Sequence, residues 1–117
     1  MKLLICGSRT FYDYKILKRE VLKFIKEQNI IITDVISGCA NGADILGEQF
    51  AADQKYNILR FPANWNKYGK SAGHIRNKQM VQIADYVICF WNKTSSGTKD
   101  TIDLCEKYDK IYKVVEF

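Results

Sequence analysis

Three short turns of small residues follow apolar segments of the chain, and they hold residue types that bind anions. Glycine lets a ligand approach the backbone, and free N–H groups at the start of a helix attract negative charge. Arg9 adds a guanidinium that can hold a phosphate through two hydrogen bonds, while serine and threonine add hydroxyl donors. The turns therefore predict a site for a small phosphorylated or otherwise anionic ligand. They are Gly7-Ser8-Arg9, Ser37-Gly38-Cys39-Ala40-Asn41-Gly42 and Ser95-Ser96-Gly97-Thr98.

The turns do not match the common nucleotide-binding signatures. The segment from Gly38 to Gly42 lacks the lysine of a P-loop, and no G-x-G-x-x-G motif follows the first apolar segment. This disfavours an ATPase or a dinucleotide-dependent dehydrogenase. Turns of small residues are common between a strand and a helix in α/β proteins, so one such turn alone does not indicate a binding site. The prediction depends on the three turns together.

A second group of chemically useful residues lies between positions 65 and 77. Trp65 and Tyr68 can stack a base, and Arg76 and Asn77 can read its edge. The alternative is that both aromatic residues anchor a long irregular loop on the core. His74 is the one histidine of the chain, without partners for a metal site or a nucleophile triad, so we expect it to contact the ligand or lie on the surface.

Strands and helices alternate along the chain and must position these residues. Apolar, β-branched runs predict strands at residues 2–6, 30–37, 58–61, 86–91 and 111–115. Apolar residues at helical spacing predict helices at residues 14–28 after an N-cap at Asp13, 43–54, 73–83 and 98–108. The alternation indicates an α/β fold with a parallel five-stranded sheet covered by helices on both faces. Ligands bind such sheets at the carboxyl ends of the strands, where the three turns meet.

Length and composition indicate one soluble domain. The chain has 117 residues, of which 47% are hydrophobic and 26% charged, so it has enough apolar content for a core. No apolar run approaches the roughly 20 residues that span a bilayer, and the N-terminal segment is too short for a signal peptide. We therefore expect one domain over residues 1–117, in the cytoplasm and with no membrane partner. The four cysteines form no C-x-x-C pair, so we expect reduced, mostly buried thiols and no metal site.

The net charge of +5 is unevenly distributed. Residues 29–53 hold four acidic side chains and no basic one, whereas residues 54–84 hold six basic side chains and no acidic one. A basic protein often binds a polyanion, so DNA binding is one hypothesis. The acidic segment borders the same edge of the sheet and argues against a long polyanion. We therefore interpret the charge as local, with the basic block beside the predicted site and suited to a small phosphate-bearing ligand.

The order and spacing of these motifs resemble a known superfamily. The chain carries Gly7-Ser8-Arg9, then Ser37 to Asp44, Phe61 to Trp65, Arg76-Asn77 and Ser96-Gly97-Thr98. This arrangement resembles the small stand-alone SLOG proteins, the YspA- and YpsA-related branch of bacteria and phages, over almost the whole chain. The resemblance implies a Rossmann-like, three-layer fold of strand order 3-2-1-4-5, a ligand between the first and fourth strands, and a homo-oligomer. The superfamily includes sensors of nucleotide-derived signals, the LOG phosphoribohydrolases and the DNA-processing protein DprA.

The LOG enzymes indicate where catalytic residues would lie. The resemblance matches their arginine and methionine on one helix to Arg76 and Met80, and part of their glycine-rich signature to Gly97-Thr98. Their catalytic glutamate falls on Thr101, which cannot ionise, whereas cleavage of an N-glycosidic bond requires a carboxylate near the anomeric carbon. Asp44 or Glu48 could substitute from another helix. The catalytic residues therefore stay unknown, with Arg76 and Asp44 as candidates, and ligand binding is favoured over hydrolysis.

The sequence thus leads to three functional hypotheses. The first is a module that binds a nucleotide or nucleotide-derived phosphorylated molecule as a sensor or sequestering protein, without a cofactor or metal. The alternative is a nucleoside 5′-monophosphate phosphoribohydrolase, and DNA binding like that of DprA ranks below it. The residues expected to bind the ligand are Gly7, Ser8, Arg9, Ser37, Gly38, Cys39, Ala40, Gly42, Asp44, Trp65, Arg76, Asn77, Ser96, Gly97 and Thr98.

Overall fold

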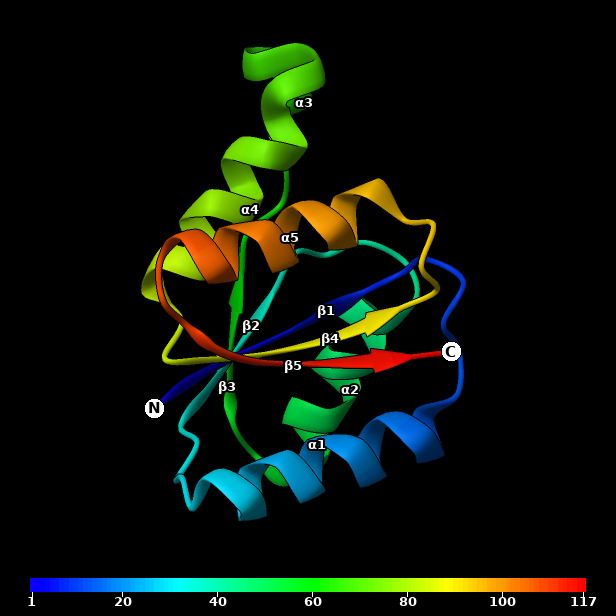
Figure 1. Cartoon of the computed structure of the whole chain (residues 1–117), viewed down its shortest axis with the longest axis vertical. Coiled ribbons are helices and arrows are strands. Elements are labelled where there is room, and N and C mark those ends of the chain that lie inside the picture. The colour runs from blue at the N-terminus through cyan, green and yellow to red at the C-terminus, as the bar shows by residue number, and fades with distance from the viewer.

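The computed structural model describes residues 1–117 and contains one five-stranded parallel sheet (Figure 1). In chain order the elements are β1 (Lys2–Gly7), α1 (Tyr14–Gln28), β2 (Asp34–Ser37), α2 (Ala43–Gln54), β3 (Asn57–Arg60), α3 (Trp65–Tyr68), η1 (Gly69–Ser71), α4 (Ala72–Ile83), β4 (Tyr86–Trp91), α5 (Ser96–Lys107) and β5 (Ile111–Glu116). The strand order is β3-β2-β1-β4-β5, and every neighbouring pair is parallel. The expected α/β fold and strand order are therefore confirmed.

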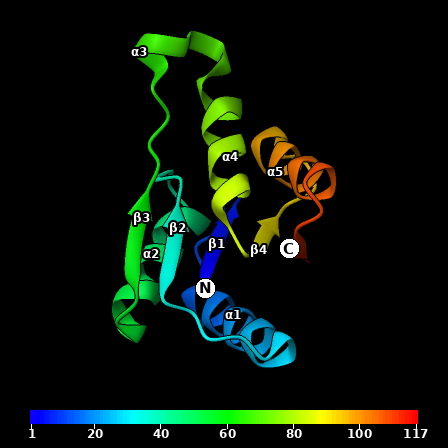
Figure 2. The same ribbon diagram turned by 90° about the vertical axis from the view of Figure 1, so that its left-hand side faces the viewer.

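Helices cover both faces of the sheet (Figure 2). α1 and α2 lie on one face, and α4 and α5 lie on the other. Side chains along β1 alternate accordingly: Leu3 and Ile5 belong to the core under α1 and α2, while Leu4 and Cys6 belong to the core under α4 and α5. This period of two gives each face its own apolar core. None of these helices has the length and apolarity needed to cross a membrane.

Local signals set both ends of α1. The side chain of Asp13 accepts a hydrogen bond from the backbone N–H of Ile16 at 3.1 Å, which satisfies one of the free donors of the first turn. Asn29 follows the helix with a φ of 52°, a left-handed conformation that asparagine adopts more readily than most residues. The helix predicted between these two residues is confirmed.

Other boundaries differ from those predicted. The strand expected at 30–37 begins only at Asp34, because Ile30 and Ile32 bury their side chains in the core from a loop and do not join the ladder. α5 begins at Ser96, two residues earlier than predicted. The reason is that Ser95 acts as its N-cap, accepting a hydrogen bond from the backbone N–H of Thr98 at 3.3 Å.

The stretch after β3, expected to be irregular, forms α3 and η1. These two elements extend beyond the end of the sheet before the chain returns through α4 (Figures 1 and 2). Asn64 caps α3 by accepting a hydrogen bond from the backbone N–H of Lys67 at 3.1 Å. Trp65 and Tyr68 are 53% and 38% exposed, so the idea that they anchor this stretch in the core is wrong.

The close approach of β1 to β4 leads to a first prediction. A Cβ at Gly7 would lie 2.3 Å from the carbonyl oxygen of Phe90 and 2.9 Å from the Cβ of Ala43. Both neighbours are parts of packed elements, so Gly7→Ala must push these elements apart. We expect the free energy of unfolding to fall by about 2 kcal/mol, a typical cost of overpacking, as measured by urea denaturation.

Gly97→Ala is the matched control for this prediction. A Cβ at Gly97 would meet nothing within 4 Å, so its effect should stay within about 0.5 kcal/mol. Equal loss of stability in the two variants would show that contact with Phe90 is not the constraint at Gly7.

Candidate functional site

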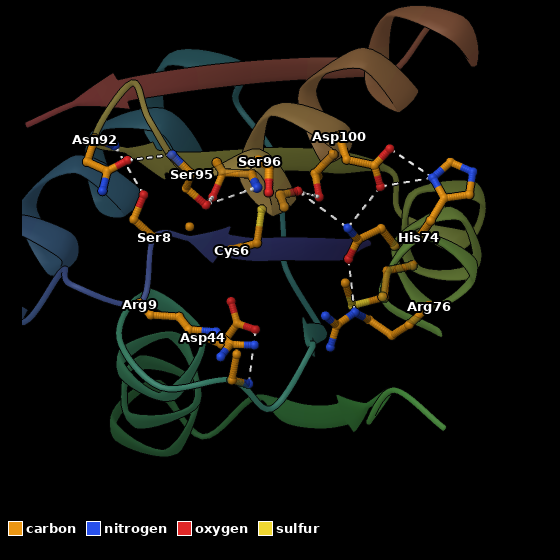
Figure 3. Close-up of a pocket in the computed structure, with 18 of the residues that line it drawn as sticks. Cys6, Ser8, Arg9, Asp44, His74, Arg76, Asn92, Ser95, Ser96 and Asp100 are labelled. Atoms are coloured by element: carbon orange, nitrogen blue, oxygen red, sulfur yellow. Dashed lines mark hydrogen bonds and ion pairs between the residues drawn. The ribbon is translucent and has the colours of Figure 1, made fainter. Parts of the chain in front are cut away.

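A cleft of about 650 Å³ opens at the carboxyl ends of β1 and β4 (Figure 3). Its walls come from the β1–α1 loop, the start of α2, the first half of α4 and the β4–α5 loop, with Trp65 of α3 at its border. The volume falls in the range of sites for small molecules. Most of the lining residues carry polar groups, because the loops that leave the strands here consist of serine, threonine, asparagine and glycine.

Most of the residues predicted to bind a ligand lie on the wall of this cleft. Those that line it are Gly7, Ser8, Arg9, Ala40, Asp44, Trp65, Arg76, Asn77, Ser96, Gly97 and Thr98. The four that do not line it belong to the second predicted turn, between β2 and α2: Ser37, Gly38, Cys39 and Gly42. The first and third turns therefore face the cleft, whereas the second reaches it mainly through Ala40 and Asp44.

The β1–α1 loop presents a fixed serine and a free arginine. Ser8 is buried, its backbone N–H donates to the carbonyl of Phe90 at 2.8 Å, and its hydroxyl accepts from the backbone N–H of Asn92 at 3.1 Å. Arg9, one residue later, is exposed and takes part in none of the ion pairs of the chain. Ser8 thus ties the loop to β4, and Arg9 keeps its guanidinium available to an anion.

The β4–α5 loop is shaped by Asn92. Its side-chain oxygen accepts hydrogen bonds from the backbone N–H groups of Thr94 and Ser95, at 3.0 and 2.8 Å, and so forms an Asx turn. Ser96 and Gly97 then begin α5, and both line the cleft. The N–H groups of a first helical turn have no partner within the helix, so this end of α5 can attract an anion.

A chain of hydrogen bonds crosses from α5 through α4 to the β2–α2 loop (Figure 3). Nδ1 of His74 lies 2.8 Å from Oδ1 of Asp100, and the amide nitrogen of Asn77 donates to Oδ2 of Asp100 at 3.1 Å. The amide oxygen of Asn77 accepts from Nε of Arg76 at 2.9 Å, and Nη1 of Arg76 donates to the carbonyl of Gly38 at 2.5 Å. His74 lines the cleft with a side chain that is 58% exposed, and α5 brings Asp100 to it as a partner that the sequence did not indicate.

Residues of the second turn outside the cleft have structural contacts. The buried hydroxyl of Ser37 donates to Glu48 at 2.7 Å, so it points at α2 rather than at a ligand. A Cβ at Gly38 would lie 2.8 Å from Oδ2 of Asp44 and 2.9 Å from Nη1 of Arg76, so this glycine lets the two charged groups come together. Gly42 has a φ of 82°, and a Cβ there would lie 2.5 Å from the carbonyl oxygen of Ser8.

Asp44 is the buried carboxyl group of the site, only 5% exposed. Desolvation by burial raises its pKa to about 6, although hydrogen bonds from the backbones of Ala40 and Gly7 and the charge of Arg76 favour the ionised form. Its Oδ2 accepts from the backbone N–H of Ala40 at 3.2 Å. The side chain therefore connects the loops after β1 and β2, and it can exchange a proton near neutral pH.

Three of the four cysteines are buried, and all four are free thiols, as expected. Cys6 lines the cleft, and its sulfur lies 3.4 Å from that of Cys89 on the neighbouring strand. The hydrogen bond with Cys89, followed by burial, raises the pKa of Cys6 well above its ordinary value, and burial raises that of Cys105 to about 12. The thiols of Cys6 and Cys105 are therefore neutral at physiological pH and lack the thiolate needed for nucleophilic chemistry.

Sequence reasoning missed several residues of the cleft wall. Asn92 was not singled out, although an asparagine directly after a predicted strand is a signal for an Asx turn. Asp100 was assigned no contact, because the packing of α4 against α5 cannot be read from one helix. The lining residues outside the predicted set are Cys6, Thr10, Gly73, His74, Met80, Asn92, Thr94, Ser95, Asp100 and Thr101.

The basic block does not gather at the cleft, which corrects the interpretation of the net charge. Of the six cations between residues 54 and 84, only Arg76 lines it. Arg60 instead pairs with Glu48 at 2.9 Å, and Lys67 and Lys70 lie on α3 and η1. The positive charge at the cleft comes from Arg9, Arg76 and the start of α5.

The burial of Asp44 predicts a pH dependence of stability. Its pKa is about 6 in the folded chain against an ordinary value of 3.8, so the folded state binds this proton more tightly than the unfolded state. The free energy of unfolding contributed by this group therefore rises as the pH falls through about 6 and levels off below about 4, with a total of about 3 kcal/mol. Urea denaturation of the wild type and Asp44→Asn across this window measures the difference. The asparagine variant should lack this rise, and parallel profiles would contradict the assignment.

Comparisons with known proteins place this geometry in a family. A protein-family model, the YspA, cpYpsA-related SLOG family, matches residues 1–68, and a search of curated proteins finds no match. Among solved structures, the chain is similar to DNA processing protein A from Helicobacter pylori, studied for its single-stranded DNA binding mode, with 21% sequence identity and a TM-score of 0.62. That similarity covers 97% of this chain but 64% of the other, and at this identity it establishes the fold alone. Because the family model matches more than half of the sequence, the chain belongs to the YspA, cpYpsA-related SLOG family.

Proposed function

We propose that the cleft binds a nucleotide or nucleotide-derived molecule through its phosphate, and that the protein acts as a sensor or sequestering module. The observation that carries the proposal is that Arg9 and the first turn of α5 both line the cleft. Arg9 has no acidic partner, and the N–H groups of Ser96 and Gly97 have none within the helix. A guanidinium and a helix N-terminus facing one space suit a phosphate.

The side of the cleft formed by α3 has an exposed aromatic residue that could stack a base of the same ligand. Trp65 is 53% exposed and lines the cleft, and its Cη2 would lie 3.5 Å from a Cβ at Gly73. Gly73 therefore lies beside the indole. An exposed aromatic ring can stack a planar base, which contributes about 1–3 kcal/mol in other proteins.

Single-stranded DNA is the competing ligand class, since the similar structure from Helicobacter pylori was studied for its binding of single-stranded DNA. A long strand requires a positively charged groove that follows the backbone. Here only one of the six cations between residues 54 and 84 lines the cleft, and the acidic residues Asp44 and Asp100 also line it. The distribution of charge therefore favours a ligand with one or a few phosphates over a polymer.

Arg9 provides the test of this function. We expect at least one of AMP, ADP, 3′,5′-cyclic AMP and ADP-ribose to bind, and Arg9→Ala to weaken it about tenfold or more, because it removes a charge-assisted hydrogen bond. Isothermal titration calorimetry measures both. Lys18→Ala is the matched control, since it removes an exposed cation from α1, which lies away from the cleft. Absence of heat with every nucleotide at millimolar concentration, or an equal loss in both variants, would refute the proposal.

A further inference from the structure

Asn77, one of the two residues expected to read the edge of a base, is not free to do so. The amide oxygen of Asn77 accepts from Nε of Arg76, and its amide nitrogen donates to Asp100 and, at 3.4 Å, to the carbonyl of Gly97. Both hydrogens of that amide are therefore engaged. Arg76 donates from Nε to Asn77 and from Nη1 to Gly38, and its remaining N–H groups can only donate. Hydrogen-bond acceptors for a base must therefore come from another part of the wall.

The His74–Asp100 pair has unused hydrogen-bond acceptors on the part of the cleft wall that also holds Trp65. Both residues line the cleft with Trp65 and Gly73, and their side chains are 58% and 29% exposed. Figure 3 shows them at the opposite end of the cleft from Arg9 and Ser8. A ligand that places its phosphate near Arg9 therefore extends its base past the start of α5 toward this pair.

The pair offers only hydrogen-bond acceptors when the imidazole is neutral. Both carboxylate oxygens of Asp100 lie close to Nδ1 of His74, at 2.8 and 3.0 Å, so an ionised Asp100 holds the proton on Nδ1. Nε2 then keeps its lone pair, and no hydrogen bond to a protein group occupies it. The carboxylate also retains acceptor positions beyond those used by His74 and Asn77. Because His74 and Asp100 then offer only hydrogen-bond acceptors, they favour a ligand whose edge carries hydrogen-bond donors.

We propose that His74 and Asp100 select a purine that carries an exocyclic amino group, adenine or guanine, stacked beside Trp65. The inference rests on the proposed function, since it needs a phosphate bound at the other end of the cleft. An amino group donates to acceptors on the protein, whereas a carbonyl or a bare C–H at the same position leaves them unpaired. Sites built to bond a polar group reject the analogue that lacks it far more strongly than an apolar pocket rejects a missing methylene.

Two pairs of probes that differ by a single amino group test this selection. They are guanosine against inosine 5′-monophosphate, and adenosine against purine riboside 5′-monophosphate. We expect at least one amino-bearing member to bind at least tenfold more tightly than its partner at about pH 8. His74→Ala should reduce this ratio to less than threefold. His74→Lys, which replaces an acceptor with a donor, should favour inosine over guanosine 5′-monophosphate.

Variants on α5 separate selection from general damage. Asp100→Asn should lower the ratio, because an amide no longer fixes the imidazole tautomer and adds a donor. Asp103→Asn makes the same chemical change one turn later, at a residue outside the cleft that pairs with Lys99, and should keep the wild-type ratio. His74 and Asp103 are both exposed, so their variants should fold, which circular dichroism verifies.

The outcomes distinguish this inference from the function on which it rests. Binding of all four probes within twofold of one another would overturn the selection while leaving nucleotide binding intact. A tenfold preference that persists in His74→Ala and Asp100→Asn would overturn the assignment to these residues. If none of the four probes binds, the selection is overturned, whereas the proposed function fails only if ADP, 3′,5′-cyclic AMP and ADP-ribose also give no heat.

Discussion

The cleft exists because β1 pairs with β2 on one side and β4 on the other. The helix after β1 lies on one face of the sheet, and the helix after β4 lies on the other (Figures 1 and 2). The two connecting loops therefore separate beyond the strands and leave a crevice at this point. Gly7 allows β1 to reach Phe90 closely, and the Ser8–Asn92 hydrogen bond holds the loops at a fixed separation. The positions of Arg9 and of the start of α5 depend on this pairing.

The polar groups around the crevice are mutually satisfied, and that limits what each can do for a ligand. No buried side-chain nitrogen or oxygen lacks a hydrogen-bond partner. The side chains of Ser37, Asn77 and Asn92 form their hydrogen bonds with other parts of the protein. Groups with unused capacity include Arg9, the first turn of α5, the remaining N–H groups of Arg76 and the His74–Asp100 pair. A polar residue on a cleft wall can therefore bind a ligand only if it has a hydrogen-bond donor or acceptor that is not already used within the protein.

The sequence carried enough information for the sheet and for the place of the cleft, since strand–helix alternation and small-residue turns both follow from backbone requirements. It could not supply contacts between elements far apart in the chain. His74 and Asp100 are 26 residues apart on different helices, so their meeting depends on how α4 packs against α5. Ser37 was misjudged because a turn residue's side-chain direction depends on Glu48 of α2. The position of the cations between residues 54 and 84 was predicted wrongly, because a count of charges along the chain does not show in which direction the lysine side chains of α3, η1 and α4 point.

The charges that remain give the cleft a direction. Figure 3 shows Arg9 and Ser8 at one end and Asp100 with His74 at the other. A phosphate moved toward Asp100 would lose the guanidinium and approach a carboxylate, and at about 4 Å each such unit interaction amounts to about 4 kcal/mol in the dielectric near a protein surface. A molecule anionic at one end and rich in hydrogen-bond donors at the other therefore fits in one orientation only. The same polarity disfavours a uniform polyanion, which would place a phosphate beside Asp100 whichever way it entered.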